Sequence, residues 1–152
     1  MAITGEDLRT LPDHLPDWIR EHLELYVGSG GREGHEWRGV TTLLLKTVGR
    51  RSGKPLLLPL IYGLDPEHPG ERFVLVASKG GAPAHPAWYL NLAAEPRVEI
   101  QAGPKQYAAH AETVSGEERA RLWSLMAAIW PDYDNYRRAT DREIPVVALS
   151  TR

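Results

Sequence analysis

The sequence has 152 residues and a mass of 17.0 kDa, which is the size of one ordinary domain. Charged residues make up 25% and hydrophobic residues 42%, a balance that excludes a disordered, collagen-like or coiled-coil chain. The 18 basic and 20 acidic side chains give a net charge of −2, which argues against nucleic acid as a partner. Cysteine is absent, so disulfides, thiolate metal ligands, iron–sulfur clusters and a cysteine nucleophile are excluded.

Neither the N-terminus nor any apolar run has the features of a targeting or membrane segment. The first residues lack the basic start and apolar core of a secretory signal. The strongly apolar runs, such as residues 56–62, are far shorter than the roughly 18–20 residues that span a membrane. We therefore expect a cytoplasmic protein.

The first half of the chain predicts one helix followed by three strands. Apolar residues recur at three- and four-residue spacing between Leu15 and Tyr26, which indicates an amphipathic helix that ends in the glycines after Val27. The β-rich runs at 40–48, 56–62 and 72–78 are apolar almost throughout. Such runs are typical of strands that are covered on both faces.

The second half predicts the elements of a mixed α+β fold. They are a helix at 86–94, strands at 97–101 and 105–114, a helix at 116–130 and a strand at 145–149. Ser115 and Glu118 have the spacing of a capping box, which predicts the start of the long helix. Because turns link most of the strands, we expect an antiparallel α+β barrel or sandwich rather than a parallel sheet.

Basic residues are concentrated in one part of the sequence. Between residues 37 and 64 there is no acidic side chain, whereas five basic residues occur there: Arg38, Lys46, Arg50, Arg51 and Lys54. The glycine-flanked turn at 49–54 predicts an anion-binding site, because backbone N–H groups and guanidinium groups converge in such turns. A solvated hairpin tip is the alternative interpretation.

Lys79 has an unusual setting. It is the only Lys, Arg, Asp or Glu between residues 73 and 94, and it stands between a predicted strand and a Gly-Gly turn that precedes a helix. That position suits contact with a phosphate or carboxylate group. An ordinary surface lysine is the alternative.

Several familiar motifs are absent or incomplete. The turn at 49–54 is one residue short of a P-loop and has Pro55 in place of its Ser or Thr. Residues 28–34 nearly match a dinucleotide fingerprint, but Glu33 replaces the third glycine and a helix precedes them. His35 and Glu36 lack the second histidine of a zinc motif, and no G-x-S-x-G sequence occurs. We therefore predict no metal site and no self-contained catalytic triad.

Three aromatic residues follow the long helix at three-residue intervals: Trp130, Tyr133 and Tyr136. One face of a helical turn carries residues at this spacing. Core packing is one interpretation, and it suits Trp130 best. A wall with hydrogen-bond donors for a planar organic ligand is the other, because a phenol combines an apolar face with a polar tip.

Six fragments together resemble the deazaflavin (coenzyme F420)-dependent nitroreductase family. They are TVGRRSGKP at 47–55, PLIY at 59–62, ASKGGA at 77–82, HPAWYLNL at 85–92, PDY at 131–133 and TDREIP at 140–145. The resemblance implies a split β-barrel of the FMN-binding type, with about six mainly antiparallel strands and flanking helices. It implies a single F420-binding domain over 1–152, with an N-terminal helix and loop at 1–37 and the barrel with its helices at 38–152.

The resemblance also implies a set of site residues. Those that would hold the phosphate and acidic tail of F420 are Arg50, Arg51, Ser52, Gly53, Lys54 and Lys79. Those that would line the deazaflavin ring are Pro59, Leu60, Ile61, Ala77, Ser78, Lys79 and Gly80, with Trp88 and Asn91 closing the site. Those that would face the electron acceptor are Trp130, Tyr133, Tyr136 and Ser78, with Trp18 as a further cover. Tyr133 or Ser78 would stabilise charge or supply a proton during reduction.

The implied activity is hydride transfer from reduced F420 to a small-molecule acceptor, either a quinone, a nitroaromatic or a conjugated carbonyl compound. One alternative is an FMN-dependent oxidase or reductase on the same fold. Another is a non-catalytic protein that binds a deazaflavin or another anionic ligand, because one fold hosts many functions. The resemblance allows peripheral membrane contact through the first helix, but the predicted helix carries mixed charges rather than a basic face. We expect a monomer or a homodimer.

Overall fold

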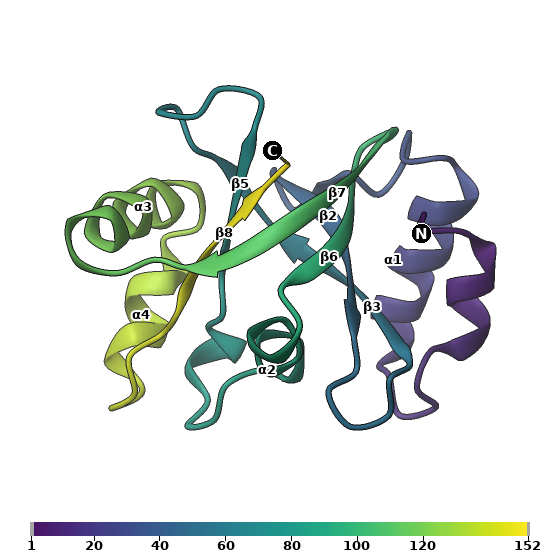
Figure 1. The fold of residues 1–152 in the computed structure, drawn as a ribbon, viewed down its shortest axis with the longest axis horizontal. Coiled ribbons are helices and arrows are strands. Elements are labelled where there is room, and N and C mark those ends of the chain that lie inside the picture. Colours follow the sequence, from purple (N-terminus) through teal and green to yellow (C-terminus); the bar gives the residue numbers. More distant parts are fainter. Residues whose placement is uncertain (1, 152) are drawn as a thin grey trace.

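The computed structural model describes residues 2–151, which form a curled antiparallel sheet with helices around it (Figure 1). The strands are β1 (Glu36–Trp37), β2 (Val40–Val48), β3 (Pro55–Ile61), β4 (Gly63–Leu64), β5 (Arg72–Val76), β6 (Arg97–Ala102), β7 (Lys105–Thr113) and β8 (Val146–Ser150). The helices are α1 (Asp17–Gly28), α2 (Ala87–Ala94), α3 (Gly116–Ile129) and α4 (Asp132–Arg138), with short 3-10 helices η1 (Gly5–Thr10) and η2 (Lys79–Gly81).

The strand pairings form a ring, which confirms the predicted split β-barrel. The order β2-β6-β7-β8-β5-β4 is antiparallel at each step, and β3 pairs with the other edge of β2. Only Tyr62 separates β3 from β4, so one continuous segment bonds first to β2 and then to β5. The segment through Tyr62 therefore joins the two ends of the curled sheet.

Alternate residues of the strands face opposite sides of the barrel wall. In β5, Phe73 and Leu75 belong to the cluster inside the barrel. Val74 and Val76 belong to a second cluster that includes residues of α3 and α4. This alternation is the two-residue period of a strand. It explains why the strand runs are apolar at nearly every position, as the sequence predicted.

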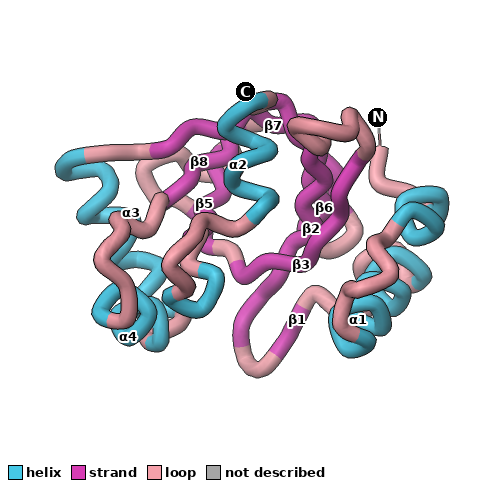
Figure 2. Tube along the Cα trace, turned by 90° about the horizontal axis from the view of Figure 1, so that it is seen from below, coloured by secondary structure: helices cyan, strands magenta, loops and turns pink. Residues whose placement is uncertain are grey.

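The N-terminal segment covers another part of the barrel wall. Figures 1 and 2 show α1 and the N-terminus on the side of the barrel away from α3 and α4. Tyr26 of α1 is fully buried, and its hydroxyl lies 2.8 Å from the carbonyl oxygen of Thr42 and accepts the N–H of Gly103 at 2.8 Å. Burial raises the pKa of Tyr26 to about 12, so the hydroxyl keeps its proton and the bonds anchor α1.

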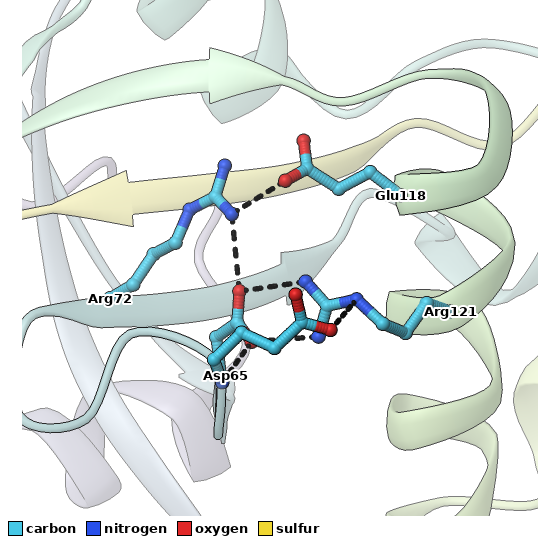
Figure 3. Close-up of polar contacts among 5 residues, drawn as sticks. Asp65, Arg72, Glu118 and Arg121 are labelled. Carbon is cyan, nitrogen blue, oxygen red and sulfur yellow. Dashed lines mark hydrogen bonds and ion pairs between the residues drawn. The ribbon is translucent and has the colours of Figure 1, made fainter.

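A cluster of ion pairs holds the start of β5 against α3 (Figure 3). The fully buried carboxylate of Asp65 accepts hydrogen bonds from Arg72 at 3.1 Å and from Arg121 at 2.8 and 3.1 Å. Arg72 also pairs with Glu118 at 2.8 Å, and Arg121 pairs with Glu67 at 2.8 Å. The hydrogen bonds from Arg121, together with the Glu67 N–H and Arg72, hold the pKa of Asp65 well below its usual range.

The predicted capping box at the start of α3 is wrong. The side chain of Ser115 makes no capping hydrogen bond, and the Glu118 carboxylate bonds Arg72 instead. The charge of Arg72 offers that carboxylate a stronger partner than the backbone N–H of a helix terminus. A box does form at η1, where Thr4 accepts a hydrogen bond from the N–H of Glu6 and its own N–H bonds Asp7.

The other predicted elements are present with small shifts at their ends. The first helix begins at Asp17, and the run predicted at 72–78 ends as a strand at Val76. The short elements β1, β4, α4, η1 and η2 were not predicted as separate units. Within residues 2–151, no helix combines the length and apolar character that crossing a bilayer requires.

Candidate functional site

A cleft of about 550 Å³ with mainly apolar walls lies beside β3. Its walls come from α1, β1, β3, the turn after β5, the start of α2, and α4. The lining residues are Trp18, Ile19, His22, Trp37, Thr42, Leu58, Pro59, Leu60, Ile61, Val76, Ser78, Lys79, Gly80, Pro86, Ala87, Trp88, Trp130, Tyr133 and Tyr136. A concave, mainly apolar site with a few polar groups is typical of organic-ligand binding.

Strand β3 supplies one wall through four consecutive residues, 58–61. Within residues 2–151 it is hydrogen-bonded to β2 along one edge only. The peptide groups of the other edge therefore have no strand partner, and Pro59, which lacks an N–H, is tolerated there. A planar ligand with its own donors and acceptors can bond to such an edge.

The turn after β5 has a strained backbone. Lys79, Gly80 and Gly81 adopt φ values of +46°, +63° and +84°. A Cβ on Gly81 would lie 2.8 Å from the carbonyl oxygen of Tyr136, so glycine permits α4 to pack against the turn. Lysine rarely adopts a positive φ, and such strain is concentrated at functional sites. The turn leaves the Lys79 side chain exposed at the edge of the cleft.

Arg142 holds this turn from outside the cleft. Its guanidinium donates to the carbonyl oxygens of Ser78 at 2.7 Å, Ala82 at 2.8 Å and Ala77 at 3.3 Å. It also lies 3.0 Å from Nδ1 of His85. Burial, followed by the charge of Arg142, lowers the pKa of His85, so the neutral ring accepts this hydrogen bond. The sequence contained Arg142 within the TDREIP fragment but indicated no role for it.

The three aromatic residues at three-residue intervals meet at the cleft. Trp130, Tyr133 and Tyr136 all line it, and Tyr133 packs edge-on against Tyr136 with ring centroids 6.1 Å apart. Trp130 is half-buried rather than a fully buried core residue, and its indole N–H lies 3.5 Å from the Tyr136 hydroxyl. Burial, with a smaller contribution from Tyr136, raises the pKa of Tyr133. At neutral pH its phenol is therefore a hydrogen-bond donor.

Trp37 is a lining residue that the sequence analysis missed. It stacks on Trp18 with centroids 6.0 Å apart and an interplanar angle of 15°, and it lies 5.9 Å from Trp130. Its strand β1 pairs with β2 through a two-residue turn in which Arg38 and Gly39 have φ of +48° and +83°. The signal for this hairpin is the glycine at a turn between two β-formers, but the strand is too short for a periodic pattern.

The basic turn forms a separate hollow of about 320 Å³, lined by Thr10, Pro12, Gly49, Arg50, Arg51, Ser52, Lys54, Pro55, Leu56 and Asn91. Asn91 is buried at its base, where its Oδ1 accepts from the backbone N–H of Arg50 at 3.2 Å and from Nη1 at 3.0 Å. Its Nδ2 donates to Thr47 Oγ1 at 3.3 Å. The amide of Asn91 thus orients Arg50 rather than reaching the cleft.

The cations of this hollow and of the cleft edge have no anionic partner among the residues that the structure describes. Within residues 2–151, the side chains of Arg51, Lys54 and Lys79 make no ion pair or hydrogen bond, and Arg50 bonds only the neutral amide of Asn91. All four side chains are exposed. An anionic ligand can therefore bind them without breaking an internal pair.

The structure distributes the predicted site residues over these two cavities. Those at the cleft are Trp18, Pro59, Leu60, Ile61, Ser78, Lys79, Gly80, Trp88, Trp130, Tyr133 and Tyr136. Those at the basic hollow are Arg50, Arg51, Ser52, Lys54 and Asn91. Ala77 and Gly53 line neither cavity; Ala77 is fully buried, and Gly53 closes the basic turn through its N–H bond to Gly49.

Comparison with known proteins identifies the family. A model described as F420H(2)-dependent quinone reductase matches residues 18–151. The chain belongs to this family. An F420H(2)-dependent quinone reductase of Mycobacterium tuberculosis is 41% identical over 138 residues, which are 88% of this chain and 90% of the relative. The family is one of oxidoreductases, and its recognition from the sequence fragments is confirmed.

Two solved structures resemble this chain in fold and sequence. A structure described as an F420-H2-dependent reductase is 38% identical, covers 72% of this chain and 93% of its own, and has a TM-score of 0.65. Another, described as a domain-swapped dimer, is 36% identical, covers 88% and 98% of the two chains, and has a TM-score of 0.68. Both agree with the split barrel described above.

Proposed function

We propose that this protein reduces quinones, and also nitroaromatic and conjugated carbonyl compounds, with reduced F420 as the hydride donor. The observation that carries the proposal is an apolar cleft next to cations that have no anionic partner in the described part of the chain. The cleft suits the flat deazaflavin ring together with the electron acceptor, whereas the cations suit phosphate and carboxylate groups. The family and the names of its relatives support the same assignment.

The residues present fit a deazaflavin with an acidic tail. Arg50, Arg51, Lys54 and Lys79 would hold its anionic groups, and the lack of an anionic partner for any of them within residues 2–151 supports this role. The open edge of β3 and the turn at Ser78 would contact the ring. When bound, the cofactor supplies hydride, and the protein supplies binding, orientation and electrostatics.

The aromatic residues would orient the acceptor. The indoles of Trp18, Trp37 and Trp130 provide flat apolar surfaces, which exclude water and restrict the acceptor to a stacked position. The Tyr133 phenol is protonated at neutral pH, so it can donate a hydrogen bond to an oxygen that gains charge. Ser78 would offer a second hydroxyl from the strained turn.

The proposal is tested by mixing the purified protein with reduced F420 and menadione, and by following oxidation of the cofactor. We expect acceptor-dependent oxidation, with a nitroaromatic compound and a conjugated enone as further acceptors. Parallel fluorescence titrations with F420, FMN and NADPH test cofactor choice. Tight F420 binding without turnover of any acceptor would favour a binding protein, whereas selective binding of FMN would favour a flavin enzyme.

We further propose that the chain can form a homodimer. The support is the solved relative described as a domain-swapped dimer. Light scattering coupled to size-exclusion chromatography distinguishes a dimer from a monomer. The cytoplasmic location and the absence of a nucleic-acid partner stay predictions from the sequence.

A further inference from the structure

The cleft shares a wall with an outer groove of about 420 Å³. The outer groove is lined by Trp18, Glu21, His22, Leu25, Gly34, Glu36, Trp37 and Arg38. Three of these residues, Trp18, His22 and Trp37, also line the cleft. Among the three, only the imidazole belongs to a side-chain type that exchanges protons near neutral pH.

The contacts of His22 determine which ring nitrogen can exchange a proton. Nε2 lies 2.7 Å from the carbonyl oxygen of Gly34. A carbonyl oxygen only accepts, so Nε2 carries hydrogen in both the neutral and the charged ring, and Nδ1 gains and loses the proton. Gly34 has a φ of +86°, and a Cβ there would lie 3.3 Å from Cδ2 of His22, so glycine permits this close approach.

A second contact orients the ring. His22 lies nearly parallel to Trp37, with an interplanar angle of 14° and centroids 6.4 Å apart. The hydrogen bond and the stacking together hold the imidazole in the wall between the two cavities.

The groups around His22 differ on its two sides. Glu21, Glu36 and Arg38 are the charged residues of the outer groove. The cleft has Lys79 at its edge, together with two tyrosines, Tyr133 and Tyr136. Because burial raises the pKa of Tyr133, its phenol donates a hydrogen bond without giving up its proton. The imidazole thus separates solvated carboxylates from an apolar reaction space.

We propose that His22 delivers a proton from the outer groove to the reduced acceptor, an inference that rests on the quinone reduction proposed above. Hydride brings two electrons and one hydrogen nucleus to the quinone, which becomes a hydroquinone monoanion. The Nδ1–H bond of charged His22 breaks, and an O–H bond forms on the anionic oxygen. Because Nε2 keeps its hydrogen, the neutral ring then takes up a proton from solvent at Nδ1. The hydride donor is oxidised, its remaining proton goes to solvent, and the quinone is reduced.

The first test compares His22→Gln with wild type. A glutamine amide can keep the hydrogen bond to Gly34, but it cannot carry a proton to the acceptor. We expect kcat with menadione to fall about 100-fold, and the dissociation constant of F420 to stay the same. The pH profile of kcat should differ between wild type and His22→Gln, because only wild type has an ionisable proton donor at this place. His14→Gln is the matched control, because His14 is exposed and lines neither cavity.

The second test is chemical rescue. His22→Ala opens space at the outer groove, so added imidazole should restore a large part of its lost kcat, but should not change the rate of wild type. The inference is wrong if His22→Gln keeps the pH profile of wild type. It is also wrong if His22→Gln loses the same fraction of kcat at all pH values and imidazole does not rescue His22→Ala. Either result refutes the role of His22 but leaves the proposed quinone reduction intact. If wild type itself does not oxidise reduced F420 with any quinone, the proposed function is wrong, and the inference about His22 is wrong as well.

Discussion

Cations occur in two contrasting settings in this protein. At the start of β5, Arg72 and Arg121 share the buried carboxylate of Asp65 (Figure 3). At the basic turn, Arg51 and Lys54 are exposed and have no acidic partner within residues 2–151. The first set stabilises the fold because its charges are already neutralised. The second set remains available for an anion, and this difference separates structural from ligand-binding cations.

The largest effect is expected from Asp65→Asn. Removing one charge from a buried ion-pair network leaves its partners incompletely paired, which costs about 3–5 kcal/mol of unfolding free energy. Urea denaturation measures this change, and F420 affinity of the folded fraction should stay near that of wild type. Glu67→Gln is the control, because the Glu67 side chain is 61% exposed in its pair with Arg121. Equal losses in the two variants would contradict the structural role assigned to Asp65.

Low pH should reduce the free energy of unfolding through the same cluster of ion pairs. The hydrogen bonds from Arg121, with those from the Glu67 N–H and Arg72, lower the folded-state pKa of Asp65 below its unfolded value. This contribution to stability is therefore complete above the unfolded carboxyl pKa of about 4 and is lost as pH falls through the lower folded value. Unfolding free energy should fall more steeply in acid for wild type than for Asp65→Asn. Parallel pH dependences would contradict this assignment.

The next largest effect is expected on F420 affinity, from substitutions in the basic hollow. Replacing both Arg50 and Arg51 by Ala should weaken F420 binding about 10- to 100-fold, because charge-assisted hydrogen bonds to the ligand are lost. Stability should change little, because these side chains hold no internal ion pair. The double variant of Arg9→Ala and Arg97→Ala removes the same charge from exposed sites elsewhere. If the control weakens binding as much, general attraction rather than this hollow binds the ligand, and added salt should remove the effect.

Asn91→Asp would turn an available cation into a paired one. The change keeps the shape of the side chain and places a carboxylate on the Oδ1 contact with Arg50, which is 3.0 Å from Nη1. The new internal anion should compete with the ligand and lower F420 affinity about tenfold. Fluorescence titration measures this, and Asn135→Asp on the exposed face of α4 is the charge-matched control. Unchanged affinity would show that Arg50 does not contact the ligand.

The smallest effect is expected from Trp18→Ala, which tests the uncharged side of the site. Trp18 is 55% exposed, so its loss should change stability by less than about 0.5 kcal/mol. The KM for a planar quinone should rise about two- to tenfold through lost stacking. Leu25→Ala is the control, because Leu25 is 48% exposed on the same helix but does not line the cleft. Equal KM values in the two variants would remove Trp18 from the acceptor wall.

Much of the fold was predictable because it depends on local patterns. The apolar runs predicted the long strands, and the prolines at 86, 96 and 131 bounded the helices near them. The capping box at Ser115 failed because Glu118 found a charged partner on β5, 46 residues away in sequence. A local rule cannot anticipate a competing partner of that kind.

The residues of the candidate site also divide into those that the sequence indicates and those that only tertiary contacts reveal. The basic turn and Lys79 were visible because several charges, or one isolated charge, stand out in sequence. Trp37 and His22 were missed because their importance depends on distant contacts, with Trp130 and with the cleft wall. Asn91 belonged to the predicted set, but only the structure shows that its amide orients Arg50.

The sequence by itself determined that this protein is a small cysteine-free member of an F420-dependent oxidoreductase family with a basic turn. Composition and short sequence fragments are enough for this conclusion, because they can be read without knowing which distant segments contact one another. Only the tertiary structure decided which cations are neutralised, how the segment through Tyr62 joins the two ends of the curled sheet, and which rings form the cleft. These features arise from contacts between segments far apart in the chain, so no local pattern encodes them.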